Sequence, residues 1–110
     1  MEVQTRSDFP YGKYAGLTKF DSVKDAYNAY KCDPNIWKIS WMENDQRITY
    51  LPKKRGVIWG DTPEWKLTEL CPKYLNSPSR EVFWLQYSPK GILLSVLTDS
   101  EFREKFCQIK

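Results

Sequence analysis

Residues 37–51 read Trp37-Lys-Ile-Ser-Trp-Met-Glu-Asn-Asp-Gln-Arg-Ile-Thr-Tyr-Leu51, and apolar and polar side chains alternate on both sides of a polar turn. Alternation with a period of two is typical of a β-strand that buries one face. The turn, Glu43–Gln46, is too short for a parallel crossover, so we expect an antiparallel pair. The expected apolar face holds Trp37, Ile39, Trp41, Ile48 and Tyr50, and the expected polar face holds Lys38, Ser40, Arg47 and Thr49.

Further strands are expected on the carboxyl side of this hairpin. Pro52-Lys-Lys-Arg-Gly56 is interpreted as a loop, and Val57–Trp59 as a short strand that completes an antiparallel meander. Residues 81–87 and 92–97 flank Ser88-Pro-Lys-Gly91, whose Pro and Gly positions suit a type I turn. These two strands are apolar on both faces, which is typical of a central position in a sheet.

Three segments carry the apolar spacing and the end signals of helices. Residues 22–31 begin with a capping Ser22 and end before Asp33-Pro34. Thr62-Pro63 starts a second helix, which Pro72 must end or kink. A third helix is expected at Thr98-Asp-Ser-Glu101, which has the pattern of a capping box. In a capping box, the side chain of each of two residues accepts a hydrogen bond from the backbone N–H of the other.

The first twenty residues look irregular, although a short strand at 13–18 fits them, and their aromatic residues favour an arm packed on the body. Residues 21–110 are then a single α+β domain, because 110 residues leave no room for a second ordinary domain. The expected order is α-β-β-β-α-β-β-α. We predict a mostly antiparallel sheet of about five strands with three helices packed on it, in two layers.

Composition restricts the environment and the cofactors. The chain is 41% hydrophobic and 28% charged, and it has neither an apolar run long enough to cross a membrane nor the apolar core of a signal peptide. Three widely spaced cysteines suggest a reducing compartment, so we expect an intracellular protein, cytoplasmic or nuclear and not secreted. With no His and no Cys-x-x-Cys pair, no metal and no cofactor are expected.

Catalysis is disfavoured for the same reasons. The absence of His removes the most common general base, and the five glycines never form a phosphate-binding loop. Cys32 and Cys107 are expected near helix carboxyl ends, where the dipole disfavours a thiolate, and Cys71 lies on a core stripe. We therefore expect a small protein that binds rather than catalyses.

The leading hypothesis places a ligand surface on the tryptophan-containing meander. The net charge is +3, and residues 53–55 form the only dense basic cluster. Basic side chains neutralise phosphates and aromatic faces stack unpaired bases, so single-stranded nucleic acid is one expected partner, and an acidic protein surface is the other. The candidate ligand-binding residues are Lys38, Arg47, Lys53, Lys54, Arg55 and Trp59.

The alternative hypothesis is a protein-interaction module or a small inhibitor. Trp65 lies opposite the apolar stripe of its predicted helix, and an exposed large aromatic tends to mark a contact surface. Tyr11 and Tyr14 of the aromatic arm are the other candidates for this surface. The sequence leaves open whether the protein is a monomer or a homodimer, and no membrane partner is expected.

Overall fold

A computed structural model describes residues 2–8, 10–54, 64–76 and 81–107 of the chain. Within these residues the elements are β1 (Val3–Ser7), β2 (Gly16–Phe20), α1 (Val23–Cys32), β3 (Ile36–Glu43), β4 (Gln46–Lys54), α2 (Glu64–Leu70), the short 3₁₀ helix η1 (Pro72–Asn76), β5 (Val82–Tyr87), β6 (Leu93–Thr98) and α3 (Asp99–Phe106). The predicted strand Val57–Trp59 and the predicted helix start Thr62-Pro63 lie outside the described residues.

The strands form one antiparallel sheet in the order β2-β1-β3-β4-β5-β6. This confirms the α+β class, with six strands in place of the expected five or so. The first twenty residues are not simply irregular, because β1 pairs with both β2 and β3. Two of the three core-facing residues of β1 are Thr5 and Ser7, so this strand shows little apolar alternation in the sequence.

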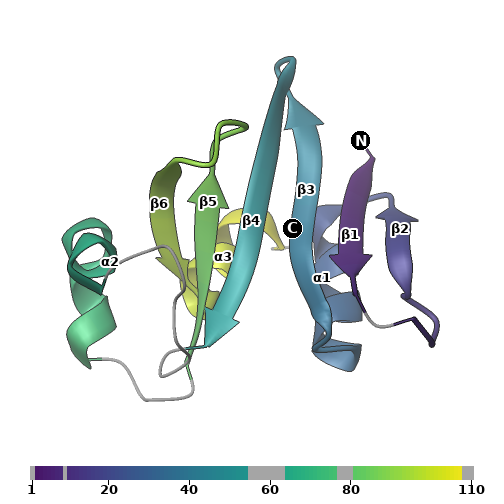
Figure 1. Cartoon of the computed structure of the whole chain (residues 1–110), viewed down its shortest axis with the longest axis horizontal. Helices are drawn as coiled ribbons and strands as arrows, with labels where there is room; N and C mark the ends of the chain where they lie inside the picture. Colours follow the sequence, from purple (N-terminus) through teal and green to yellow (C-terminus); the bar gives the residue numbers. More distant parts are fainter. Residues whose placement is uncertain (1, 9, 55–63, 77–80, 108–110) are drawn as a thin grey trace.

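Helices α1 and α3 cover one face of the sheet and lie behind it in Figure 1. Both begin as predicted: the Ser22 hydroxyl accepts a hydrogen bond from the backbone N–H of Asp25, and Thr98 and Glu101 form the capping box. The core beneath them is aromatic, and the rings of Trp84 and Phe102 stack with their centroids 4.0 Å apart. Large flat side chains thus fill the space between this sheet and its helices.

On the other face of the sheet, the described helices α2 and η1 lie over β5 and β6. Phe83 and Leu85 point away from the core that contains Trp84, since neighbouring residues of a strand point to opposite faces. They pack with Leu67 of α2 in a second buried cluster, which also contains Cys71, Tyr74, Leu93 and Val96. The structure therefore departs from the expected two layers, because α2 and η1 add a partial third layer.

Two irregularities in β3 and β4 correct the sequence analysis. Trp37 was expected on the apolar face, but the register between β1 and β3 shifts at this position. Arg6 pairs with Lys38, whereas Ser7, the next residue of β1, pairs with Ile36. Such a β-bulge re-aims a side chain, and Trp37 is 37% exposed. Pro52 was expected to begin a loop, yet β4 continues to Lys54. Beyond Tyr50, β4 pairs with β5 but not with β3. A strand that is paired on one side only tolerates a proline, which has no backbone N–H.

Candidate functional site

No described helix covers the sheet face opposite α1 and α3 over β1, β3 and β4, and we call this area the open face. Strand alternation places Arg6, Lys38 and Arg47 on it, and we call these three residues the cation cluster. Arg6 lies directly opposite Lys38 across the β1–β3 pair. Arg47 reaches across to β3, where its Nη1 donates a hydrogen bond of 3.3 Å to the hydroxyl of Ser40, the residue two before its pairing partner Met42.

No described carboxylate pairs with the cation cluster. Among the described residues, no carboxylate oxygen lies within 4.0 Å of a charged nitrogen of Arg6, Lys38 or Arg47. Partial burial lowers the pKa of Lys38, and the neighbouring charges of Arg6 and then Arg47 lower it further. The three side chains therefore repel one another, and an anion placed between them would relieve that repulsion.

The structure brings only part of the predicted ligand surface together. Lys38, Arg47 and Lys53 lie on the open face, since Lys53 pairs with Phe83 of the outward-facing cluster. Lys54 pairs with Val82, which packs against the core under α1 and α3, so Lys54 points to the helix-covered face. Arg55 and Trp59 lie outside the described residues.

Two residues of this surface were not predicted from the sequence. Arg6 belongs to β1, which the sequence analysis assigned to an irregular arm, and only the pairing of β1 with β3 places it beside Lys38. Trp37 was assigned to the core, and the bulge turns it outward. Neither position carries a local signal, because both depend on how distant segments pair.

The residues of the alternative hypothesis lie at opposite ends of the sheet. Trp65 is 67% exposed on α2, which packs over β5 and β6. Tyr11 is 73% exposed in the connection between β1 and β2, and Tyr14 packs on Phe20 with ring centroids 5.8 Å apart. Figure 1 shows this connection and α2 on the two far sides of the sheet. At about 4.8 Å per strand they are roughly 20 Å apart, so they do not form one patch.

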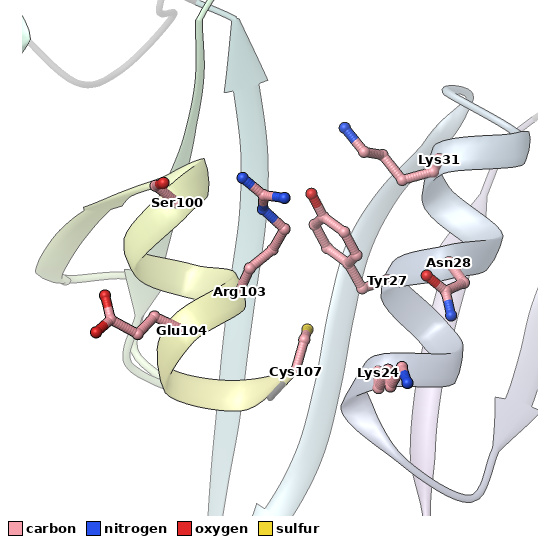
Figure 2. Close-up of a pocket in the computed structure, with 8 residues that line it drawn as sticks. All are labelled: Lys24, Tyr27, Asn28, Lys31, Ser100, Arg103, Glu104 and Cys107. Carbon is pink, nitrogen blue, oxygen red and sulfur yellow. The ribbon is translucent and has the colours of Figure 1, made fainter. Parts of the chain in front are cut away.

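A groove of about 620 Å³ separates α1 from α3 on the helix-covered face (Figure 2). Its lining residues are Lys24, Tyr27, Asn28, Lys31, Ser100, Arg103, Glu104 and Cys107. Figure 2 shows Lys31 and Arg103 directed toward the Tyr27 hydroxyl and Glu104 directed away from α1. The charged side chains that line the groove are therefore mostly cationic, and the groove is the second candidate site.

Three polar side chains at the centre of this groove, those of Tyr27, Lys31 and Arg103, interact with the protein itself. The Tyr27 hydroxyl donates to Asp99, and Arg103 Nε lies 3.5 Å from Asp99 Oδ2. The Lys31 ammonium sits 5.6 Å from the centroid of the Tyr27 ring. Burial, followed by the charge of Asp99, raises the pKa of Cys107 to about 11, so this thiol is a poor nucleophile near neutral pH. We interpret the groove as a structural network rather than as a reactive site.

Neither a search for metal sites nor the comparisons with known proteins assign a function to this chain. Within the part of the chain that the structure describes, no three His, Cys, Asp or Glu side chains are grouped to hold a metal, and no helix combines the length and apolarity needed to cross a membrane. Comparison with protein-family models, with curated proteins and with solved structures finds no match for this chain.

Proposed function

We propose that the open face binds single-stranded nucleic acid, chiefly through its phosphates. The observation that carries this proposal is the cation cluster of Arg6, Lys38 and Arg47, which has no carboxylate partner among the described residues. Proteins seldom place like charges together without a compensating anion, because the repulsion costs stability. A chain of phosphates supplies the missing negative charge at regular intervals.

The surroundings of the cluster also suit a polyanion. Gln4 and Thr49 flank Ser40 in one row across β1, β3 and β4, and their polar side chains can bond phosphate oxygens. Lys53 continues the positive charge along β4. The exposed ring of Trp37 beside Lys38 favours nucleic acid over an acidic protein, because single-strand binders combine cations with aromatic faces.

The test is the salt dependence of binding to a fluorescently labelled single-stranded oligonucleotide of mixed sequence, measured by anisotropy. Three or four phosphate contacts predict that Kd rises about 20- to 50-fold between 50 and 200 mM salt. Replacing Lys38 and Arg47 together (Lys38→Gln and Arg47→Gln) should weaken binding at low salt and flatten the salt slope by about 1.4.

A matched control separates the open face from net charge. The pair Lys24→Gln and Lys31→Gln removes the same charge from α1, on the other side of the sheet. We expect this control to keep nearly the full affinity and salt slope. Equal losses in the two double variants, or no binding at 50 mM salt, would overturn the proposal. Equally tight binding to a polyglutamate of the same charge would favour an acidic protein surface instead.

A further inference from the structure

A groove lies at the end of the sheet where β3 and β4 separate, next to the cation cluster. The two strands pair from Glu43 and Gln46 at the turn down to Ile39 and Tyr50. Beyond that point β3 pairs with β1, whereas β4 pairs with β5. Figure 1 shows the two strands together near their turn and splayed apart at the opposite end. The splay leaves a groove of about 670 Å³, within the usual range of small-molecule sites.

Trp37 of β3 and Lys53 of β4 line this groove from its two strands. The other lining residues are Asp8, Pro10, Pro34 and Asn35. The two prolines make stiff walls, since their rings fix the backbone. Asp8 and Asn35 add a carboxylate acceptor and an amide to the lining, and such groups can bond the edge of a base.

The β-bulge in β3 places the Trp37 ring in this groove. Without the bulge, alternation would bury the ring beside Ile39. The Lys38 ammonium lies 5.5 Å from the centroid of the indole, so the aromatic ring adjoins the cation cluster directly. Exposure of so large an apolar ring forfeits the stability that its burial would supply, and such an exposed aromatic tends to mark a contact.

We infer that the groove is a base-stacking subsite, in which one unpaired base of the bound strand stacks on Trp37 and an adjacent phosphate meets Lys53. This inference rests on the proposed function and names its ligand class more closely as a strand with bases free to stack. Duplex nucleic acid keeps its bases stacked on one another, so it would meet only the cations. The subsite therefore distinguishes single strands from duplexes.

The test compares an intact oligonucleotide with an abasic strand of the same length and phosphate number. Loss of one base–aromatic stack weakens binding about 5- to 140-fold. We expect Trp37→Ala to weaken binding of the intact strand by this factor and to leave binding of the abasic strand unchanged. Trp65→Ala is the matched control, because it removes a second exposed tryptophan far from the cation cluster.

A conservative variant guards against a trivial loss of folding. Trp37→Phe keeps a ring for stacking, so it should retain most of the affinity while losing the quenching of tryptophan fluorescence that the intact strand causes. Equal affinity of Trp37→Ala and the unaltered protein for the intact strand would overturn the subsite and leave the phosphate surface standing. No binding of either strand to the unaltered protein at 50 mM salt would instead overturn the proposed function.

Discussion

The hydroxyl of Tyr27 on α1 lies 3.0 and 2.9 Å from the two carboxylate oxygens of Asp99 on α3 and donates a hydrogen bond to them. Trp84 of β5 donates its indole N–H to the same carboxylate at 3.0 Å. A single side chain therefore links two helices to each other and to the sheet that they cover. The carboxylate is only 18% exposed, and its position in the first turn of α3 suits its negative charge.

Removing this carboxylate should destabilise the protein markedly. Asp99→Ala leaves the Tyr27 hydroxyl and the Trp84 N–H without their acceptor, and we expect the free energy of unfolding to fall by about 2 to 4 kcal/mol. Asp99→Asn keeps one acceptor oxygen and should lose less. Urea denaturation measures both, with Glu104→Ala on the exposed side of α3 as a control that changes stability little.

Replacing a buried hydroxyl in β1 should instead stabilise the protein. Thr5 is 1% exposed, and its Oγ1 has no hydrogen-bond partner among the described residues. Thr5→Val replaces an unsatisfied hydroxyl with a methyl group of similar size, so the free energy of unfolding should rise by about 1 kcal/mol. Thr5→Ser keeps the hydroxyl and loses the methyl, and it should be less stable than the unaltered protein. If Thr5→Val were less stable than Thr5→Ser, the result would show that the Thr5 hydroxyl has a hydrogen-bond partner.

Stability should decline at acid pH partly through Glu101. The Thr98 backbone N–H bonded to its carboxylate, aided by the nearby charge of Lys73, holds the pKa of Glu101 below its usual 4.5, although partial burial opposes this. A group with a lowered pKa in the folded state stabilises above its unfolded pKa and loses that contribution as the pH falls through its folded value. Glu101→Gln should therefore be less stable than the unaltered protein at pH 7, and the difference should shrink below pH 4.5. Denaturation curves at several pH values check this, and a constant difference would contradict it.

The cysteines should differ in reactivity. Cys32 is exposed, whereas the pKa of Cys107 is raised to about 11, so only about one Cys107 in a thousand is a thiolate at pH 8. We expect iodoacetamide to modify Cys32 well before Cys107 at pH 8, and the rate at Cys107 to keep rising toward pH 11. Mass spectrometry of peptides gives both rates, and in urea the two rates should converge. Equal rates in the folded protein would show that Cys107 is not shielded.

Much of the helical structure could be predicted from local residues. Helix α1 follows from its apolar spacing and Ser22, and α3 from its capping box, because the physical causes lie within one or two turns of the chain. The hairpin of β3 and β4 was equally local. Its turn residues Asn44 and Asp45 both adopt positive φ, as a tight hairpin requires.

The candidate site depended instead on long-range pairing. Arg6 joins Lys38 only because β1 inserts between β2 and β3. Trp37 faces outward only because of a bulge, and a one-residue shift moves a side chain to the opposite face of a sheet. The same rule separates Lys53 from Lys54, which the sequence had grouped as one basic cluster. Side-chain direction in a sheet therefore required the register, which local residues did not specify.

If the open face binds single strands as we propose, the partial covering of the sheet by α2 and η1 limits how many nucleotides one copy contacts. Only β1, β3 and β4 present the cation cluster, and three strands span about 10 to 15 Å. A footprint of this width accommodates only a few nucleotides, so a long strand would carry many copies of the protein in succession. Saturation would then scale with ligand length, and neighbouring copies would come close enough to touch.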